Sequence, residues 1–205
     1  MRPQVLVLAK TPVPGRVKTR LCPPWSPADA ARLAAAALRD TLEAVSATPA
    51  ARRTLVVDGS YPPPPGWHRC AQRGDGLPAR LAHAFADTRL PGVPSVLVGM
   101  DTPQVTPELF GDAARLLADA DAVLGLAADG GWWALGLCDP AHASVLRDVP
   151  TSTGSTGART LDALRGRGLR VAMLPTLRDV DTADDAISVA ASCRAGSRFA
   201  AAVAG

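Results

Sequence analysis

The sequence predicts an α/β fold with one mostly parallel sheet and helices on both of its faces. Short apolar runs that are typical of buried strands alternate with longer helical patterns along most of the 205 residues, and this alternation is characteristic of parallel sheets. The length suits one compact domain, and a hydrophobic fraction of 47% supplies enough apolar side chains for a core. We therefore expect a single domain over residues 1–205.

The expected strands are short runs rich in Val and Leu that are bounded by turn residues. They lie at residues 5–8, 54–58, 67–72, 95–99, 122–126 and 169–174, with one more entered from the turn at 129–131. Ligands of such sheets bind at the carboxyl ends of the strands. The segments that follow these runs are therefore where a site is expected.

The expected helices begin at recognisable caps. Ser26 is a favoured N-cap, Pro27 suits the first helical position and Asp29 adds an acid to the first turn, so a helix should run to about residue 46. Further helices are expected at residues 77–88, 107–118, 157–165 and 183–191. The Ala-rich tail at 192–205 is expected to be a loose helix or partly disordered.

The bulk composition excludes several classes of protein. The net charge of +3 suits small anionic substrates, and without a basic helix or aromatic–basic ladder it gives no reason to expect nucleic acid. The four cysteines lie far apart without a C-x-x-C pair, which argues against zinc and redox sites and favours a reducing cytoplasm. No run approaches the ~20 apolar residues of a membrane span. The sequence permits a homodimer.

The loop at residues 9–21 follows the first strand and carries Lys10, Arg16, Lys18 and Arg20. Two prolines and a glycine make it a shaped loop rather than a helix. The chain has 22 Lys and Arg residues, and its two lysines both lie here. Lys and Arg are not interchangeable at a tight phosphate site. A basic loop after a strand is typical of phosphate binding in α/β folds, and a merely solvated loop is the alternative.

Three acidic residues also follow strands. Asp101 comes after the run at 95–99, and Asp179 and Asp181 follow the last strand. In an extended segment these last two side chains point the same way, and carboxylates are ligands that Mg²⁺ or Mn²⁺ prefers. Together with the loop lysines, the three acids predict a metal site. The alternative is a turn or helix cap at Asp101 and Asp181.

The run at residues 129–133 combines a tight turn with two aromatic rings. Gly130 and Gly131 allow a close backbone approach to a ligand. Trp132 and Trp133 point to opposite faces of a strand, so one ring belongs to the core and the other is free to stack on a sugar or base. A hairpin turn with one exposed aromatic is the alternative.

Four motifs in chain order resemble a known family. They are A-K-x-P-x-P-G-x-V-K-T-R-L at residues 9–21, G-x-D-x-P at 99–103, D-G-G with two aromatics and x-L-G-L at 129–137, and D-x-D-T-x-x-D at 179–185. They resemble the small bacterial glycosyltransferases sometimes found beside radical-SAM genes. The first motif is long and specific, whereas the last is shared with a wider set of nucleotidyltransferases.

This resemblance implies a GT-A, nucleotide-diphospho-sugar transferase fold in which a divalent metal bridges the phosphates of a nucleotide. The implied nucleotide- and phosphate-binding residues are Ala9, Lys10, Gly15, Arg16, Lys18, Arg20 and Gly76. The implied ligands of Mg²⁺ or Mn²⁺ are Asp101, Asp179 and Asp181. The residues facing the sugar or acceptor would be Gly130, Gly131, Trp132 and Trp133. The candidate catalytic residues are Lys18, Asp101 and Asp129, the last as the base of an inverting reaction.

The implied function is transfer of a sugar from a nucleoside diphosphate sugar to a small acceptor. The alternative is a nucleotidyltransferase that joins CTP or GTP to a small phosphate- or phosphonate-like oxyanion and releases pyrophosphate, because a cationic loop with several carboxylates suits a triphosphate as well. A non-catalytic nucleotide-binding module is a third hypothesis. The acceptor stays open, since the tryptophan pair stands where tyrosines are commoner in the family and Thr151-Ser152 stands where Trp-Ser is frequent. The hydroxyl-rich residues 151–157 fit either an anion cradle or a plain loop.

Overall fold

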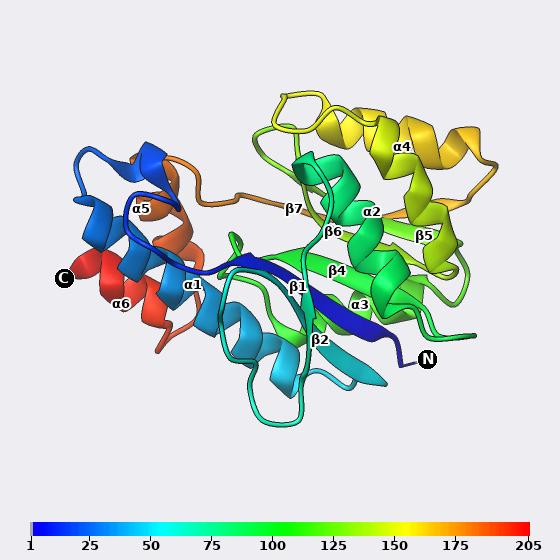
Figure 1. The fold of residues 1–205 in the computed structure, drawn as a ribbon, viewed down its shortest axis with the longest axis horizontal. Helices are drawn as coiled ribbons and strands as arrows, with labels where there is room; N and C mark the ends of the chain where they lie inside the picture. Colours follow the sequence, from blue (N-terminus) through cyan, green and yellow to red (C-terminus); the bar gives the residue numbers. More distant parts are fainter. Residues whose placement is uncertain (1) are drawn as a thin grey trace.

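A single seven-stranded sheet organises the chain in the computed structural model, which describes residues 2–205 (Figure 1). The strand order is β3-β2-β1-β4-β6-β5-β7. The strands are β1 (Gln4–Lys10), β2 (Arg52–Asp58), β3 (His68–Ala71), β4 (Ser95–Gly99), β5 (Ala122–Ala127), β6 (Trp132–Leu137) and β7 (Val171–Leu177). Strand β6 runs antiparallel to both of its neighbours, and the other pairs are parallel. The predicted mostly parallel α/β sheet is therefore confirmed.

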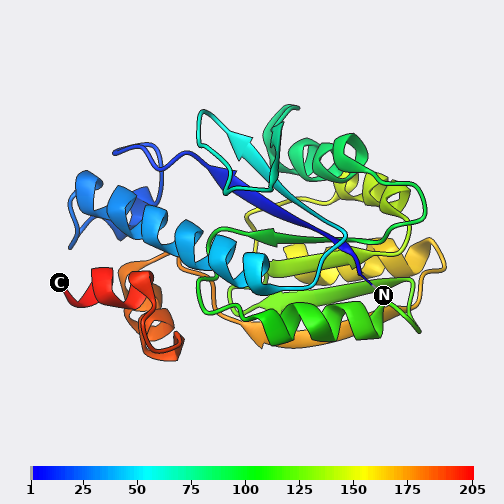
Figure 2. The same ribbon diagram turned by 90° about the horizontal axis from the view of Figure 1, so that it is seen from below.

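Helices cover both faces of this sheet. They are α1 (Pro27–Ala47), α2 (Gly76–Thr88), α3 (Pro107–Leu116), α4 (Thr156–Gly166), α5 (Ala183–Ser192) and α6 (Arg198–Ala204), with 3₁₀ helices η1 (Thr19–Leu21) and η2 (Pro140–Asp148). Figure 2 shows α1 and α3 on one side of the sheet and α2 on the other. Alternation along β1 produces the two layers, because Val5 and Val7 pack with α1 and α3 while Leu6 packs with α2 and α4.

The start of α1 follows the predicted signals. Ser26 and Asp29 form a reciprocal capping box, and Pro27 takes the first helical position. The inner face of this helix is buried as its spacing predicts, from Leu33 to Val45. The capped start of α1 matters for the site, since only residues 22–26 separate it from the basic loop.

The last strand lies further along the chain than its apolar pattern indicates. The pattern predicts residues 169–174, whereas the strand begins two residues later and ends three residues later, at Leu177. Pro175 is tolerated within it because β7 is the edge strand of the sheet, where one row of backbone groups has no partner strand. Helix η2 was not expected, although Asp139 caps it by accepting a hydrogen bond from the Ala141 N–H.

The expectation of a loose tail is wrong. Helix α6 packs beside α1 (Figure 1), and its Phe199 side chain is fully buried against α1 and α5. The buried carboxylate of Asp40 on α1 accepts hydrogen bonds from the Ser197 hydroxyl at 2.7 Å and from the Phe199 N–H at 2.9 Å. One aromatic anchor and one buried acid therefore hold a segment whose alanine-rich composition gives little indication of order.

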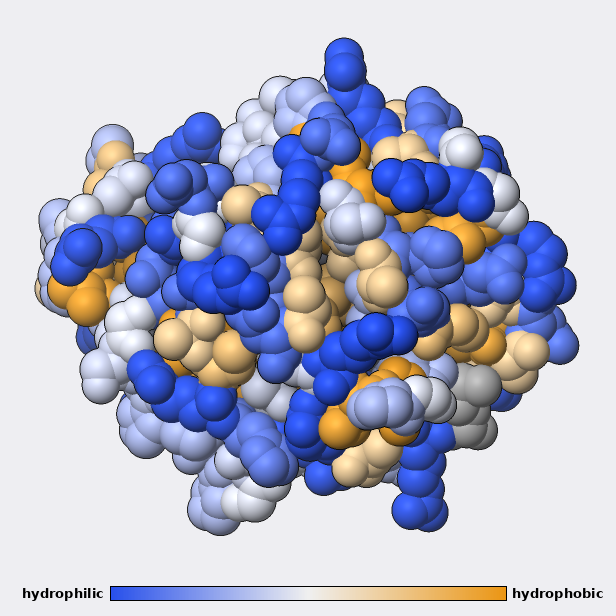
Figure 3. All heavy atoms as spheres, turned by 45° about the vertical axis from the view of Figure 1, so that its right-hand side comes forward, coloured by the Kyte–Doolittle hydropathy of each residue, from blue (hydrophilic) through white to orange (hydrophobic). Residues whose placement is uncertain are grey.

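The surface drawn in Figure 3 is mostly hydrophilic, with apolar atoms in small separate patches. The large hydrophobic side chains exposed among the described residues are Val13, Leu77, Met173 and Ile187. Within residues 2–205, no helix combines the length and the apolar character needed to cross a membrane.

Candidate functional site

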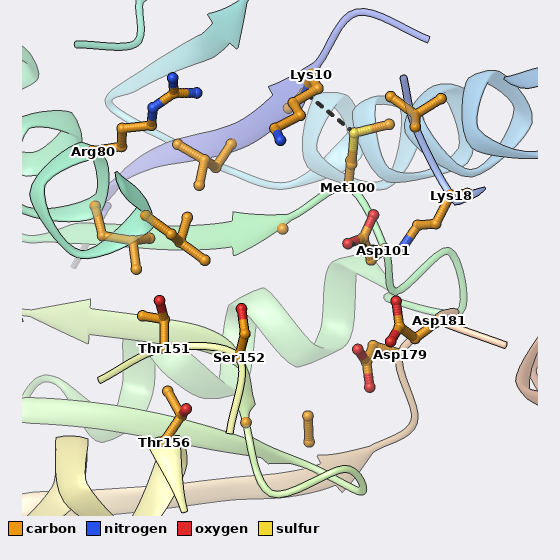
Figure 4. A pocket seen from close by; sticks show the side chains of 18 of the residues that line it. Lys10, Lys18, Arg80, Met100, Asp101, Thr151, Ser152, Thr156, Asp179 and Asp181 are labelled. Carbon is orange, nitrogen blue, oxygen red and sulfur yellow. Dashed lines mark hydrogen bonds and ion pairs between the residues drawn. The ribbon is translucent and has the colours of Figure 1, made fainter. Parts of the chain in front are cut away.

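A cleft of about 960 Å³ opens at the carboxyl ends of β1 and β4, and its walls include the loops that follow β2, β5 and β7, the start of α2 and the segment before α4. Figure 4 shows Lys10 and Arg80 on one side of it, Thr151 and Ser152 on the opposite side, and Lys18 with three aspartates at one end. The residues that line it fall within the segments 8–10, 16–20, 76–81, 97–101, 127–132, 151–156 and 179–181, with Ala34, Asp58 and Gln72 in addition. These come from both halves of the chain, as expected for a site at the edge of a parallel sheet.

The basic loop reaches the acidic end of the cleft through Lys18. Its side chain is only 12% exposed, and its ammonium lies 2.9 Å from Oδ2 of Asp101. The same ammonium donates a hydrogen bond to the carbonyl of Val180. Arg20, two residues further on, forms a 2.5 Å ion pair with Asp181. The loop after β1 is thus joined to the segments after both β4 and β7.

The two acidic segments are also joined to each other. The Val180 N–H donates to the backbone carbonyl of Asp101 at 2.9 Å. The Val180 side chain is buried against Leu21 and the α1–α5–α6 layer, so it fixes the residues on either side of it. Asp179 and Asp181, the two neighbours of this anchored residue, therefore both face the cleft, as the alternation of an extended segment predicts.

Asp179 lies in an environment that disfavours its charge. Burial raises the pKa of its carboxyl to about 6, and the negative charges of Asp129 and Asp101 act in the same direction, while Lys18 partly opposes them. Carboxylates from three different loops thus share one end of the cleft. An excess of negative charge of this kind is what a bound cation would relieve.

The predicted three-carboxylate metal site is not assembled in this conformation. Within residues 2–205, no three His, Cys, Asp or Glu side chains lie close enough together to hold a metal ion. Asp101 and Asp181 are paired with Lys18 and Arg20 instead. The chemistry of the donor set nevertheless fits a hard divalent cation, since its members are all carboxylates and the charge of Asp179 is disfavoured by burial and by neighbouring acids.

Two glycines shape the turn before β6, and only one of them lines the cleft. Gly131 borders the cleft, and its N–H donates to Oδ1 of Asp129 at 2.7 Å. Gly130 has φ +89° and packs against the loop at 151–156, where a Cβ would lie 2.0 Å from the carbonyl oxygen of Gly154. Its own carbonyl accepts from the Gly157 N–H at 2.8 Å. Gly130 therefore positions the opposite wall and lies outside the cleft lining.

The tryptophan pair divides as the alternation of a strand requires. Trp132 lines the cleft. Trp133 is 3% exposed in the core, and its indole N–H donates to the Pro175 carbonyl at 2.9 Å. Gly125 makes room for this ring, because a Cβ there would lie 2.4 Å from the indole nitrogen. The assignment of Trp133 to the acceptor site is therefore corrected, and it is a core residue.

The cleft brings together most of the residues that sequence reasoning selected. Those that line it are Ala9, Lys10, Arg16, Lys18, Arg20, Gly76, Asp101, Asp129, Gly131, Trp132, Asp179 and Asp181. Those outside its lining are Gly15, Gly130 and Trp133. Gly15 has φ +74° and serves the turn of the basic loop instead.

Sequence reasoning missed three polar residues of the cleft. Arg80 on α2 pairs with Asp58 at 2.7 Å, and Gln72 donates to the Ala9 carbonyl at 2.7 Å, which ties β1 to the segment after β3. Asp58 could have been found, because it ends a predicted strand at the same edge of the sheet as Asp101. Arg80 gave no signal, since one arginine on a helix is ordinarily a solvated surface residue.

A family model matches residues 32–153; its description is "uncharacterized protein conserved in bacteria", DUF2064. The chain belongs to this family. A sequence search of curated proteins finds no match. Among solved structures, a candidate nucleotide-diphospho-sugar transferase from Desulfovibrio desulfuricans G20 is 27% identical, with 98% of this chain and 94% of that chain covered and a TM-score of 0.85.

Two more distant structures share the fold. A CMP:2-keto-3-deoxy-manno-octonic acid synthetase complexed with CTP is 11% identical over 89% of this chain and 94% of that chain, with a TM-score of 0.56. Rv0371c of Mycobacterium tuberculosis in complex with manganese is 20% identical over 92% of this chain and 98% of that chain, with a TM-score of 0.55. All three structures share the predicted fold, and the D. desulfuricans structure confirms the predicted nucleotide-diphospho-sugar transferase superfamily and with it the prediction of a transferase.

Proposed function

We propose that this protein is a metal-dependent glycosyltransferase that moves a sugar from a nucleoside diphosphate sugar to a small acceptor. The observation that carries the proposal is the meeting of the lysine-bearing loop after β1 with the acids after β4 and β7 at one end of a single cleft. The 27% identity to the D. desulfuricans protein over 98% of this chain supports the same activity. One domain would carry the whole site, since its residues extend from 8 to 181.

The cations of the cleft would bind the diphosphate. Lys10 lies at the end of β1, and Arg16, Lys18 and Arg20 follow in the loop. Cations fixed by a folded loop stabilise the negative charge that develops on a departing diphosphate without having to reorganise during the reaction. These four residues would therefore lower the barrier to breaking the bond between the sugar and the phosphate.

Asp101, Asp179 and Asp181 would hold Mg²⁺ or Mn²⁺ beside the diphosphate. When bound, such an ion supplies positive charge that stabilises the leaving oxygen. The carboxylate-only donor set and the raised pKa of Asp179 support this role, and so does the manganese found in the M. tuberculosis protein of the same fold.

The opposite wall would receive the acceptor. Trp132 offers an aromatic face on which a sugar ring can stack, and Thr151 and Ser152 offer hydroxyls. In an inverting reaction, the acceptor hydroxyl oxygen forms a bond to the anomeric carbon, and the bonding electrons leave with the diphosphate. The exposed carboxylate of Asp129 would take the proton of that hydroxyl.

A second candidate function is nucleotidyl transfer, in which CTP or GTP is joined to a small phosphate- or phosphonate-like oxyanion. The observation that favours it is the number of cations in one cleft, because Arg80 adds a fifth to the four of the basic loop. That many positive charges suit a triphosphate. The CTP-bound synthetase of the same fold makes this candidate concrete.

Product analysis separates the two candidates. The protein would be incubated with Mn²⁺, an acceptor mixture and each nucleotide or nucleotide sugar in turn, and the products would be resolved by anion-exchange chromatography. Release of a nucleoside diphosphate from one nucleotide sugar supports glycosyl transfer. Release of pyrophosphate from one triphosphate overturns it in favour of nucleotidyl transfer. Failure of every nucleotide to react, with the Asp101→Asn variant indistinguishable from the natural protein, contradicts both.

A further inference from the structure

The acidic end of the cleft already contains a cation that belongs to the protein. The ammonium of Lys18 lies 2.9 Å from Oδ2 of Asp101 and donates to the carbonyl of Val180. A carboxylate and a backbone carbonyl are both oxygen donors of the kind that a divalent metal takes. Lys18 thus fills a position built for a cation, and its side chain is 12% exposed.

The backbone that delivers this ammonium is in an unfavourable conformation. Lys18 has φ +49° and ψ +39°, the left-handed region that residues with a Cβ rarely adopt, and it shares this property with Ser152 among the described non-glycine residues. Conformations of this kind persist only where the surrounding structure enforces them, and they concentrate at clamps and switch regions. At Lys18 the surrounding contacts are those of its ammonium with Asp101 and Val180 and the hydrogen bond that its carbonyl accepts from the Leu21 N–H.

The turn that carries Asp101 is incompletely hydrogen-bonded in this conformation. Within residues 2–205, the buried side-chain polar atoms without a partner are Oγ1 of Thr54, Oγ1 of Thr102 and Oε1 of Gln104, so two of the three lie in this one turn. Buried polar groups are ordinarily paired. The turn therefore has hydrogen-bonding capacity that a second arrangement of the acidic end can use.

Lys10 provides the contrast within the same cleft. It lines the cleft as Lys18 does, yet in the part of the chain that the structure describes it makes no ion pair with an acid. Lys10 can meet an incoming phosphate without giving up any partner. Lys18 is already held by Asp101, so turning its ammonium toward a phosphate loosens that ion pair and returns one carboxylate to the site.

We propose that Lys18 is the resident cation of the nucleotide-free protein, that it competes with a divalent metal for Asp101, and that it passes to the diphosphate when nucleotide and metal bind together. This inference rests on the proposed function, since it takes Asp101 as a metal ligand. It has a direct consequence. Metal alone binds weakly because it must displace Lys18, whereas a nucleotide, by drawing Lys18 away, couples its own binding to that of the metal.

Titration with Mn²⁺ alone tests the proposal, with free Mn²⁺ measured by electron paramagnetic resonance. The natural protein would be compared with Lys18→Met, Lys10→Met and Arg32→Met. Lys10→Met removes the same charge from the same cleft, and Arg32→Met removes one from a surface pair with Asp29. Thermal unfolding of each variant would establish that it is folded.

Lys18→Met should bind Mn²⁺ about tenfold more tightly than the natural protein. The substitution frees the Asp101 carboxylate and also removes a positive charge that repels the metal ion. Lys10→Met should gain about threefold at most, since only a screened repulsion is lost, and Arg32→Met should gain nothing. Adding Asp101→Asn to Lys18→Met should abolish the gain. Equal affinities for Lys18→Met and Lys10→Met would overturn the proposal.

A second titration, with uridine or guanosine diphosphate present, separates this inference from the proposed function. Tight Mn²⁺ binding by the natural protein with a diphosphate, combined with no gain in Lys18→Met alone, overturns the competition and leaves the metal-dependent function standing. Failure of every protein to bind Mn²⁺ in either titration overturns both. Binding that follows the predicted order in the first titration and strengthens with diphosphate supports both.

Discussion

At one end of the cleft, the ammonium of Lys18 lies 2.9 Å from Oδ2 of Asp101, and this contact joins the loop after β1 to the turn after β4. The Val180 backbone closes the arrangement, since its N–H binds the Asp101 carbonyl and its own carbonyl accepts from Lys18. Three segments far apart in sequence are held together by one lysine, one aspartate and one buried valine.

The Lys18–Asp101 pair should act as a unit in catalysis. Asp101→Asn and Lys18→Met should each lower kcat/KM by about 100-fold, because each removes charge that the transition state needs. The double variant should lose much less than the product of the two, since the residues act on the same leaving group. Steady-state kinetics checks this, with Asp112→Asn, from a surface pair with Arg115, as an unaffected control. Fully multiplicative losses would show that the two residues act independently.

The two tryptophans should respond to substitution in opposite ways. Trp133→Ala should cost about 3–5 kcal/mol of unfolding free energy, because it empties a buried site and leaves the Pro175 carbonyl without its donor. Trp132→Ala should cost clearly less stability, because its ring is only partly buried against the core, and it should raise KM for the acceptor. Urea unfolding and acceptor titrations measure the two effects. Equal stability losses would contradict the division of the pair between core and cleft.

Gly130 should be the most restrictive glycine of the site. Gly130→Ala should cost about 2 kcal/mol or more, because its Cβ would overlap the Gly154 carbonyl and its φ of +89° is strained for alanine. Gly92→Ala is the matched control, since Gly92 also has positive φ but open space around it, and it should cost about 1 kcal/mol. Thermal unfolding compares them. Similar losses would show that the contact with the loop at 151–156 is unimportant.

Stability should fall as pH rises, through Asp179. The pKa of its carboxyl is raised to about 6 in the folded protein, above the ~3.9 of an unfolded aspartate. Between these values the folded state binds more protons, so the unfolding free energy decreases from about pH 4 to about pH 6. Asp179→Asn should therefore stabilise the protein at pH 7.5 by about 1 kcal/mol, a figure reduced for the partial solvent exposure of the group, and should have little effect at pH 4.

Urea unfolding at the two pH values measures this difference. Asp184→Asn, an acid in the first turn of the neighbouring helix α5, serves as the control. A stability gain that is the same at pH 4 and pH 7.5 would contradict the assignment to a buried, charge-repelled carboxylate.

The anchoring of the C-terminal helix should depend on Asp40. Asp40→Ala should cost about 3 kcal/mol, because it leaves the Ser197 hydroxyl and the Phe199 N–H without their buried acceptor. Glu43→Ala, which removes only exposed ion pairs with Arg194 and Arg198, should cost less than about 1 kcal/mol. Limited proteolysis should cut within 193–205 of the Asp40 variant first. Equal resistance of the two variants would argue that Phe199 alone holds the tail.

Much of this fold follows from local patterns in the sequence. The strand at 95–99 and the helix capped by Ser26 are predictable because an all-apolar run and an N-cap serine followed by proline each specify local structure almost independently of context. The site was predicted in outline for a related reason. Residues that follow the strands of a parallel sheet converge at one edge, so the positions of Lys18, Asp101 and Asp179 after strands are enough to predict that they meet.

What could not be predicted depends on packing between distant segments. The core position of Trp133 rests on space provided by Gly125, and nothing in the run at 129–133 shows which ring faces inward. The order of the tail rests on Asp40, in the middle of α1. The pairing of Lys18 and Arg20 with the predicted metal ligands is likewise a tertiary property, because ion pairs across a cleft have no signature in either segment alone.

The central claim, that this cleft binds a nucleotide through its basic loop and a metal at Asp101, is tested most directly by thermal unfolding with a nucleotide panel. The four nucleoside triphosphates and the UDP-, GDP-, dTDP- and ADP-sugars would be compared with Mn²⁺, with EDTA, and with Asp101→Ala. A true ligand raises the midpoint in proportion to the logarithm of its concentration over Kd. The account predicts stabilisation by one nucleoside diphosphate sugar that disappears in EDTA and in the variant. Stabilisation that is the same in all three conditions, or none by any nucleotide, would contradict it.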